Sequence, residues 1–570
     1  MITSRLLRPL RKTRALHRNN TIEWKPLDAR ITRSCSCSAP LALSATNSPS
    51  IHAGRELDAE RRKKRARGTI EDHAADHRTI GTAQSLFTTH SSSPGAPFFQ
   101  PDGTHIFQKL VSFLRAQYPH FGFHEVLTPT IYKEELWQQS GHWANYRDDM
   151  FTVTGNSSQE PTELPIEFKD RRVQPKNIHK EPKELEEYGL KPMNCPGHCL
   201  LYKSERRSYR DLPIRYAEFS PLHRNEVSGA LSGLTRVRRF HQDDGHIFCR
   251  PSQVREEINK SLAFMRLVYE TLNFRDYHLV LSTRPRENYL GTVEEWDRAE
   301  DHLSAALIAN FDKRWHREKG EGAFYGPKID VILRDSDGKK HQTGTIQLDF
   351  QLPKRFQLAY ESPAPDLEAK GEDWKDSESR TTLGQATPVM IHRAILGSLE
   401  RFMALLLEHY RGQLPFWLNP NQVVILTVSD KEHVTSYAEK VRRELVGLTT
   451  EQLPRSLSTP TCTVDIDDSA DTIAQKVVRA KKKRYGMICV VGERNVTGAA
   501  SSHGDTVDLD VAAQPDQEKT WSLINTVKPG SQAPVQKDKG VGASFRGSPG
   551  VRLSIYQCVE LIRKLNDAFA

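Results

Sequence analysis

The sequence has 570 residues, of which 37% are hydrophobic and 27% charged, a composition typical of globular chains long enough for several domains. Its formal net charge of +9 favours an acidic partner such as nucleic acid. Eight scattered cysteines do not make a disulfide framework in a chain of this length, and no apolar run approaches the roughly 18 residues that a membrane-spanning helix needs.

The first 60 residues have the profile of a mitochondrial targeting segment. Arginines recur every three or four residues up to Arg18, leucines lie between them, and no acidic residue precedes Glu23. Pro9 would interrupt a continuous helix, so a disordered basic tail that binds RNA is the alternative. We predict a targeting and disordered segment over residues 1–60, followed by a basic linker over residues 61–96.

Two histidines in the linker have a spacing that could hold a metal ion. His73 and His77 are four residues apart and would share one helix face. In a metalloprotease helix a glutamate follows the first histidine, but here Ala74 does. The pattern therefore favours structural histidines over a metal site.

The main folded region is predicted to begin at Pro97. Apolar residues recur on one face from residue 106 to residue 114, which predicts a core helix with Asp102 as a possible N-cap. Residues 121–132 predict a strand ending at Pro129, followed by a helix through Trp137. Residues 152–188 are expected to form an exposed insertion. Two prolines then hold Cys195 and His198 in a stiff turn, where a lone cysteine is by itself a weak metal candidate.

Residues 215–246 predict a hairpin with an unusual charge. Arg224 and Glu226 lie on the first arm, and the second arm carries Arg236, Arg238 and Arg239. An antiparallel hairpin of this kind places several guanidinium groups over one point, and guanidinium forks suit phosphate oxygens. The hairpin therefore predicts a polyphosphate site, with an exposed basic hairpin or a plain RNA-binding loop as the alternative.

Further strands and helices follow the hairpin. Residues 256–272 predict an amphipathic helix, and strands are expected near residue 280, over residues 322–330 and over residues 342–350. Thr345, Gln347 and Asp349 alternate along the last of these strands, which predicts a polar pocket wall or, alternatively, an exposed edge.

After a charged insertion over residues 362–382, a strand is expected up to Leu396, then a turn at Gly397 and a helix from Ser398. Arg401 would lie in the first turn of that helix, where the helix dipole also favours an anion.

The composition changes beyond Pro415 to alternating strands and helices. Strands are predicted at VVILTV, TVDID and MICVVGE, and helices at SYAEKVRRELVG, DTIAQKVVRAKKKRYG and the final YQCVELIRKLNDAF. The second helix ends in a basic run, which is either an RNA-binding patch or a solvated face. Its members are Lys476, Arg479, Lys481, Lys482, Lys483 and Arg484. Residues 495–550 are rich in Gly, Ser, Asp and Lys.

Several motifs together resemble those of the threonyl-tRNA synthetases, a family of class II aminoacyl-tRNA synthetases, over roughly residues 70–570. The strand around Pro129 is similar to class II motif 1, HRNE…RVRRFHQDD to motif 2 and GSLERF to motif 3. MNCPGH, QDDGHIF, FYGPKI and VMIHRAILGSLERF are similar to the threonine enzyme in particular. The class I signatures HIGH and KMSKS are absent from the sequence.

The resemblance implies an α+β fold. A mainly antiparallel class II sheet flanked by helices would occupy residues 97–415, and an α/β anticodon-binding domain residues 416–570. The implied reaction is ATP-dependent formation of threonyl-adenylate and transfer of the threonyl group to tRNA(Thr). The implied setting is the mitochondrial matrix, with a homodimer as the assembly.

The resemblance also implies residue roles. Arg224 and Arg401 would act in catalysis. ATP, accompanied by Mg²⁺, would be bound by Arg224, Glu226, Arg236, Phe240, Gln347 and Arg401. Threonine would be bound by Gln242, Asp244, Tyr325, Lys328 and Gln342. A substrate-binding Zn²⁺ would be held by Cys195, His246 and His392, a set that leaves coordination positions open.

The sequence departs from the family pattern at several points. Arg239 stands where the family usually has Gly, and Thr343 replaces a residue that is commonly Cys. Only about 80 residues precede the expected catalytic domain, so we expect no N-terminal editing domain of the bacterial kind. A catalytically inactive paralogue and a cytosolic isoform are the alternatives to a mitochondrial enzyme.

Overall fold

The computed structural model describes residues 76–155, 186–287, 289–311, 314–370, 383–447, 462–498, 505–531 and 550–570. The targeting segment expected over residues 1–60 lies outside the described residues, and so does His73. Within the described ranges, no helix combines the length and the apolar character needed to cross a membrane.

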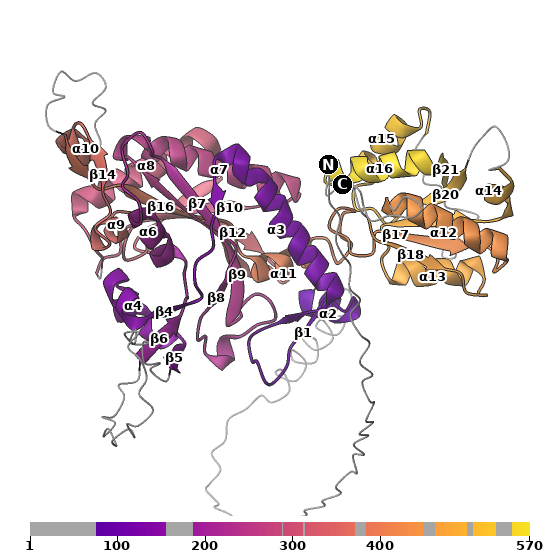
Figure 1. Cartoon of the computed structure of the whole chain (residues 1–570), viewed down its shortest axis with the longest axis horizontal. Coiled ribbons are helices and arrows are strands. Elements are labelled where there is room, and N and C mark those ends of the chain that lie inside the picture. The colour runs from indigo at the N-terminus through magenta and orange to yellow at the C-terminus, as the bar shows by residue number, and fades with distance from the viewer. Residues whose placement is uncertain are drawn as a thin grey trace, which may run out of the picture. The chain divides into compact units, whose positions relative to one another are not determined.

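A nine-stranded sheet forms the centre of the larger folded region (Figure 1). Its strands follow the order β11-β10-β12-β13-β16-β9-β7-β3, with β8 paired to β9 beside this path. The β10–β11 and β3–β7 pairs are parallel, and the other pairs are antiparallel. The strands are β3 (His124–Glu125), β7 (Ile214–Glu218), β8 (Pro221–His223), β9 (Arg239–Cys249), β10 (His278–Ser282), β11 (Trp315–Glu318), β12 (Lys328–Arg334), β13 (Lys340–Asp349) and β16 (Val389–Ser398). This sheet confirms the expected α+β class.

Four helices share one hydrophobic core with the central sheet. They are α3 (Pro101–Phe121), α7 (Val254–Thr271), α8 (Val293–Phe311) and α11 (Leu399–His409). Leu110 of α3, Leu262 of α7, Leu303 of α8 and Phe402 of α11 are all fully buried in that core. Because these side chains recur at helical spacing on one face of each helix, burial of that face fixes the helices on the sheet.

Shorter elements surround the central sheet. The helices are α4 (Glu134–Ser140), α5 (His142–Tyr146), α6 (Cys195–Lys203), α9 (Gln351–Arg355) and α10 (Pro365–Lys370). A three-stranded sheet has the order β4-β6-β5, and a two-stranded sheet pairs β14 with β15. These strands are β4 (Ile131–Lys133), β5 (Thr152–Gly155), β6 (Glu186–Leu190), β14 (Tyr360–Ser362) and β15 (Gly384–Ala386). The two ends of the insertion expected over 152–188 therefore pair with each other, and its middle lies outside the described residues.

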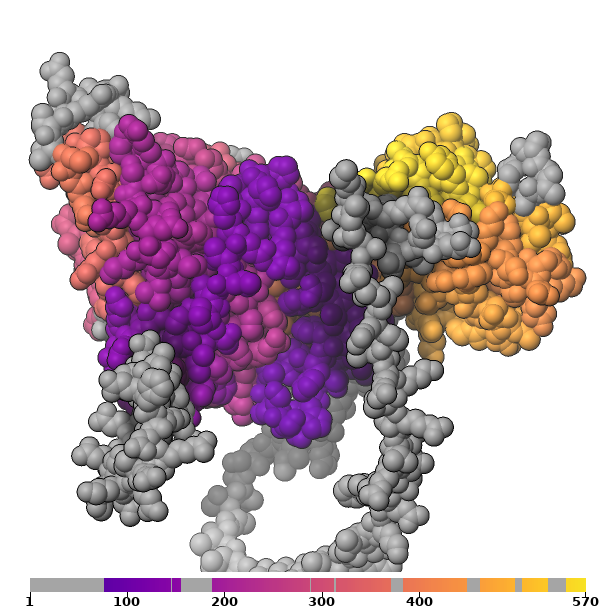
Figure 2. Space-filling model, viewed as in Figure 1, coloured from indigo at the N-terminus to yellow at the C-terminus, as the bar shows by residue number. Residues whose placement is uncertain are grey.

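Residues 76–99, most of which the sequence assigns to a linker, contain regular structure. They form α2 (His77–Ala83), β1 (Phe87–Thr88) and β2 (Phe98–Phe99). Ile80 and Leu86 are buried in the same core as α3 and α11. In Figure 2 the indigo residues at the start of the described chain lie directly against the magenta residues of its middle part. The segment from Asp76 onward is therefore part of the folded body that contains the central sheet.

Two predicted details near the start of this body are wrong. Asp102 is not the N-cap of α3, because the helix begins one residue earlier at Pro101, with Gln100 as its N-cap. Proline is favoured in the first helical turn because it needs no N–H partner there, and Asp102 instead lies in that turn. The strand expected over 121–132 is split between β3 and β4, since Pro129 lacks the N–H that a continuous ladder requires.

Two further predictions are wrong. The strand expected from Gly322 begins only at Lys328, because residues 323–326 form a turn in which the Gly326 N–H donates to the carbonyl oxygen of Ala323. Cys195 is not in a turn but begins α6, with Pro196 in the first helical turn. The helix start matters because it fixes the direction of the Cys195 side chain.

The C-terminal region has the expected α/β character. Its five-stranded sheet has the order β18-β17-β19-β20-β21. The strands are β17 (Val423–Thr427), β18 (Val464–Asp467), β19 (Met487–Val491), β20 (Thr506–Asp510) and β21 (Val551–Ser554). The helices are α12 (Glu432–Val446), α13 (Ile473–Lys482), α14 (Glu493–Gly498), α15 (Gln517–Val527) and α16 (Ile555–Asp567). β20 and α15 lie within residues 495–550, the stretch that is rich in Gly, Ser, Asp and Lys.

The basic run on α13 is partly occupied within the fold. Lys476 is 1% exposed and donates to the carbonyl oxygens of Thr427 and Asp467. Arg479 forms ion pairs with Asp467 and Asp471. Arg479, Lys481, Lys482 and Lys483 are the exposed cations of this run, and Arg479 alone among them forms these ion pairs at the surface.

Candidate active site

One cavity of about 350 Å³ collects nearly all of the site residues expected from the sequence. A volume of this size is in the range of small-molecule sites. Its lining includes Cys195, Arg224, Glu226, Arg236, Phe240, Gln242, Asp244, Tyr325, Lys328, Gln342, Gln347, His392 and Arg401. His246, the one remaining member of the expected set, is fully buried and contacts His392.

The register of three central strands places the side chains of the cavity floor. His392 of β16 pairs directly with His246 of β9 on one side and with Gln347 of β13 on the other. Directly paired residues of neighbouring strands point to the same face of a sheet. The three side chains therefore lie in one row across the sheet.

Three guanidinium groups meet on the other side of the cavity. Arg401 donates to the carbonyl oxygens of Thr235, at 2.9 Å, and Gln342, at 2.8 Å. Burial and the positive charges of Arg224 and Arg236 lower the pKa of Arg401. Like charges held close together stabilise an anion between them, so this arrangement suits a polyphosphate.

Arg224 has the features of a group that awaits a ligand. Its guanidinium carbon lies 5.1 Å from the centre of the Phe240 ring. Its Nε is buried and has no hydrogen-bond partner among the residues that the structure describes. An unpartnered buried donor costs free energy, which a phosphate oxygen in the cavity would recover.

The two other arginines of the hairpin point elsewhere. Arg238 donates to the carbonyl oxygen of Glu226 and to the Ser228 hydroxyl, so it stiffens the hairpin from within. Arg239 lies 3.4 Å from Nε2 of His241 and does not line the cavity. Of the charged residues named on the hairpin, Arg224, Glu226 and Arg236 thus line the cavity.

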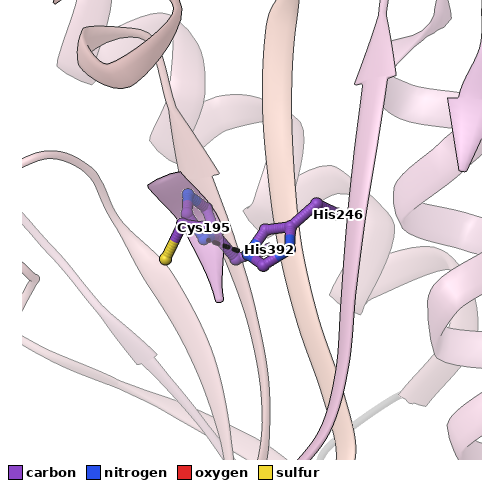
Figure 3. A group of neighbouring side chains, drawn as sticks. All are labelled: Cys195, His246 and His392. Atoms are coloured by element: carbon purple, nitrogen blue, oxygen red, sulfur yellow. Dashed lines mark hydrogen bonds between the residues drawn. The ribbon is translucent and has the colours of Figure 1, made fainter. Parts of the chain in front are cut away.

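Cys195, His246 and His392 form a compact group of potential metal ligands (Figure 3). One ligand atom from each lies within 4.8 Å of the others, and all three residues are buried. Burial lowers the pKa of His246 well below its ordinary value, which keeps the imidazole neutral and able to bind a metal. A thiol and two imidazoles are the donor types that Zn²⁺ prefers.

The hydrogen bonds around this group leave two ring nitrogens facing each other. Nε2 of His392 lies 2.9 Å from Asp349, and Nδ1 of His246 lies 2.7 Å from Nδ1 of His198. His198 in turn donates from Nε2 to Glu218, at 3.0 Å. If each carboxylate accepts a ring proton, Nε2 of His246 and Nδ1 of His392 both present lone pairs, and they are 3.0 Å apart. Two lone pairs this close fit a shared cation, so the residues present fit a zinc ion.

The polar residues beside the metal group already have partners. Asp244 accepts a hydrogen bond from Asn194 at 3.1 Å, and Tyr325 donates to Gln347 at 2.6 Å. Asp330 accepts from Gln342, at 2.7 Å, and forms an ion pair with Lys328, at 2.9 Å. These contacts hold the polar side chains in fixed positions along the cavity, an arrangement that suits a small polar ligand.

Sequence reasoning missed the residues that support the metal group. They are Asn194, His198, Glu218 and Asp349. The alternation of Thr345, Gln347 and Asp349 correctly predicted that Asp349 shares a sheet face with Gln347, but it did not predict the contact between Asp349 and His392. Glu218 had no local signal, because its partners Lys191 and His198 are 27 and 20 residues away in the chain.

Glu218 gives a prediction about acid stability. Burial opposes its charge, but hydrogen bonds from His198, Lys191 and Thr128 outweigh burial and lower the pKa of Glu218 from 4.5 to about 2. A carboxyl with a depressed folded-state pKa stabilises the fold above its unfolded pKa and loses this contribution as the pH falls toward the folded value. Glu218→Gln should therefore reduce the free energy of unfolding at pH 7 by about 3 kcal/mol.

Urea unfolding at a series of pH values tests this prediction. The difference between wild type and Glu218→Gln should shrink as the pH falls from 4.5 toward 2. Glu205→Gln is the control, because Glu205 is exposed and its ion pair with Arg207 lies at the surface. An equal loss of stability for Glu218→Gln at pH 3 and at pH 7 would contradict the prediction.

Comparison with known proteins places this site in a family. Residues 178–410 match the tRNA synthetase class II core domain (G, H, P, S and T), and residues 422–507 match the anticodon binding domain. The chain is 46% identical over 460 residues to the probable mitochondrial threonine–tRNA ligase of Schizosaccharomyces pombe, covering 80% of this chain and 90% of that protein. It is 44% identical to the mitochondrial threonine–tRNA ligase of Saccharomyces cerevisiae, covering 73% of this chain and 83% of that protein.

A solved structure supports the same assignment. The crystal structure titled as the RNA binding domain of threonyl-tRNA synthetase from Cryptosporidium parvum superposes with a TM-score of 0.64 at 37% identity, covering 86% of this chain and 98% of that one. The chain spans about half the length of several other relatives, whose names include both cytoplasmic and mitochondrial threonine–tRNA ligases. With its antiparallel sheet, its guanidinium cluster and these matches, the chain belongs to the threonyl-tRNA synthetases, a family of class II aminoacyl-tRNA synthetases.

Proposed function

We propose that this protein activates L-threonine with ATP to form threonyl-adenylate and then transfers the threonyl group to the 3′ end of tRNA(Thr). The observation that carries the proposal is the pairing of two clusters in one cavity. Arg224, Arg236 and Arg401 line one end of the cavity, and Cys195 and His392 lie with His246 at the other end. A cavity with an arginine cluster at one end and a potential metal site at the other can hold an amino acid carboxylate next to the α-phosphate of ATP.

The chemistry needs positioning and charge neutralisation more than it needs a nucleophile from the protein. The threonine carboxylate oxygen attacks the α-phosphorus, the bond to the bridging oxygen breaks, and pyrophosphate leaves with Mg²⁺. Arg224 would bind the α-phosphate, and Arg236 and Arg401 would bind the γ-phosphate. Fixed positive groups at these oxygens stabilise the charge of the transition state without reorganising.

Adenine recognition requires one rearrangement in the hairpin. Phe240 would stack on adenine, and Glu226 would accept a hydrogen bond from its amino group. Glu226 is paired with Arg236 in this structure, at 2.7 Å. When Arg236 turns to the γ-phosphate, the Glu226 carboxylate becomes available to the base, so phosphate and adenine binding are coupled through this ion pair. Gln347, which we also assign to the ATP site, would contribute from β13.

Threonine would bind at the other end of the cavity. Cys195, His246 and His392 would hold a zinc ion that, when bound, offers open coordination positions to the amino and hydroxyl groups of threonine. Gln242, Asp244, Tyr325, Lys328 and Gln342 would surround the amino acid. A polar site built for a hydroxyl group rejects valine strongly, because its polar groups would be left unpartnered. Serine keeps the hydroxyl group, so this site alone discriminates less against serine.

Threonine-dependent ATP–pyrophosphate exchange is the direct test of the proposed function. Exchange should be strong with threonine, absent with valine and measurable but weaker with serine. Charging of tRNA(Thr) transcripts should follow the same order. Absence of exchange with threonine by a zinc-loaded, folded protein would overturn the proposal and favour an inactive paralogue.

We also propose that the enzyme acts in the mitochondrial matrix. The arginine-rich, acid-poor composition of residues 1–60 and the names of the two fungal mitochondrial relatives support this location. Residues 1–60 fused to a fluorescent reporter should carry it into mitochondria, and a cytosolic signal would favour the alternative isoform.

A homodimer formed through the motif 1 region is a further part of the proposal. Leu127, next to β3, is 80% exposed, and Ile131 at the start of β4 is 41% exposed. Apolar side chains left this exposed beside a sheet edge favour burial against a second copy. Sedimentation should give the mass of a dimer, and Leu127→Asp should shift the protein toward monomer.

A further inference from the structure

His77 connects the two chain segments that carry the phosphate-facing arginines. It begins α2, and its side chain is buried. Its Nδ1 lies 2.7 Å from Oε1 of Glu408 in α11, and its backbone N–H donates to the same oxygen at 3.1 Å. The backbone N–H of Leu234, in the hairpin loop, donates to Nε2 of His77 at 3.2 Å. Because Nε2 accepts, the ring proton lies on Nδ1, and both ring nitrogens are in use.

These hydrogen bonds also argue against a metal ion bound by His77. Asp76, His77 and Glu408 lie close enough together to form a second group of potential ligands among the described residues. Both ring nitrogens of His77 are engaged, and the other Glu408 oxygen accepts from the backbone N–H of Ser336 at 2.8 Å. Burial opposes the charge of Glu408, but the hydrogen bonds from His77 and Ser336 lower its pKa overall. The group is therefore a hydrogen-bonded anchor around an ionised carboxylate.

The loop side of this anchor leads directly to the ATP-binding residues. Gly233 has φ +47°, and a Cβ at this position would overlap Nε2 of His77. Leu234 is fully buried, and the next residue, Thr235, accepts a hydrogen bond from Arg401 at 2.9 Å. Arg236 follows immediately. The hydrogen bond to His77 thus fixes the backbone two residues before an arginine that faces the phosphates.

The helix side of the anchor leads to the third arginine. Glu408 follows Arg401 by seven residues along α11, which is about two turns, so both side chains lie on the same face of the helix. α2 lies beside α11 (Figure 1). One imidazole therefore ties the hairpin loop to the helix that bears Arg401.

We propose that His77 is a positioning residue for ATP. Its hydrogen bonds to Leu234 and Glu408 hold Arg236 and Arg401 at a fixed separation, so that both guanidinium groups reach the same terminal phosphate. This inference rests on the proposed function, because that function places ATP between the two arginines. It also assigns α2 a part in nucleotide binding.

Two conservative variants separate the loop contact from the helix contact. His77→Gln is long enough to keep an acceptor near the Leu234 N–H, and the backbone N–H of residue 77 still ties it to Glu408. His77→Asn is shorter and reaches only Glu408. Gln84→Ala is the matched control, because Gln84 ties the same helix to the carbonyl oxygen of Gly412, at 2.9 Å, away from the hairpin loop. The three variants change α2 or its C-cap, and only His77→Asn is expected to lose the hydrogen bond to the Leu234 N–H in the hairpin loop.

The measurements are the KM for ATP in pyrophosphate exchange and the Kd for Mg-ATP by calorimetry, with Tm and zinc content as checks on the fold. His77→Asn should raise both constants by about 3- to 10-fold, the effect of one lost hydrogen bond, with the KM for threonine unchanged. His77→Gln should stay within about twofold of wild type. Gln84→Ala should lower the Tm without changing either ATP constant.

Several outcomes would overturn the inference. A wild-type Kd for Mg-ATP in His77→Asn would do so, and so would an equal rise in Gln84→Ala. A measurement on the wild-type protein also decides it: hydrogen exchange at the Leu234 amide should be slow without ATP, and exchange as fast as at the exposed Gly229 would exclude the bond. Wild-type protein that binds Mg-ATP but shows no threonine-dependent exchange overturns the proposed function instead.

Discussion

Arg224→Ala should lower kcat for threonine-dependent pyrophosphate exchange by about 10²- to 10³-fold. This is the usual cost of removing one preorganised group that stabilises charge in a transition state. The Arg224 guanidinium lies against Phe240, and its buried Nε has no partner in the described part of the chain, so the side chain is already placed for an anion. Because its contact strengthens as charge develops at the α-phosphorus, we expect kcat to fall more than the KM for ATP rises.

Arg206→Ala is the matched control for Arg224→Ala. Arg206 is exposed and does not line the cavity, so its removal should leave exchange within about twofold of wild type. Exchange that survives in Arg224→Ala at more than about a tenth of the wild-type rate would contradict the assignment of Arg224 to the α-phosphate.

Cys195→Ala should remove both bound zinc and threonine activation. Zinc content, measured by plasma emission spectrometry, should fall from close to one ion per chain to a small fraction. Loss of one of three protein ligands leaves two imidazoles, which hold Zn²⁺ far less tightly. Exchange with threonine should fall by at least about 10²-fold, since the site loses the group that recognises the hydroxyl and the amine. The Kd for Mg-ATP should change little, because the guanidinium cluster is built from other residues.

Cys199→Ala is the control for Cys195→Ala. Cys199 lies one turn later on the same helix, is fully buried and lies 3.9 Å from the sulfur of Met390, outside the metal group. Its substitution should reduce stability and leave zinc content unchanged. A Cys195→Ala protein with full zinc content would remove Cys195 from the proposed ligand set, and zinc loss in both variants would point to a general loss of folding.

The sequence predicted those parts of the site that depend on local patterns. The hairpin arginines are close in the chain, and the motifs around Cys195, His246 and His392 carry the resemblance to the family. Their meeting in space depends on strand register, which pairs His392 with His246 across 146 residues. The family resemblance supplied this long-range information, since spacing alone does not reveal which strands are neighbours.

The supporting residues were missed for a physical reason. His198 and Asp349 hydrogen-bond to the imidazoles of the proposed zinc site, and Glu218 hydrogen-bonds to His198. Such bonds leave no periodic pattern in a sequence. The structural role favoured for His77 agrees with its hydrogen bonds, but its partners Glu408 and Leu234 are far away in the chain and could not be identified from its spacing to His73. Short strands such as β20 escaped detection because five residues in a Gly- and Ser-rich context carry too little alternation.

The position of β16 between β13 and β9 has a consequence for how this region can change. His392 is flanked by Ile391 and Arg393, which point to the opposite face of the sheet. Losing or gaining one residue ahead of His392 in β16 would exchange these faces, and would send an apolar or cationic side chain to the position of this proposed zinc ligand. Insertions and deletions should therefore be tolerated in the loops on either side of β16 and rejected within it, so that length variation in this part of the chain is confined to the turns.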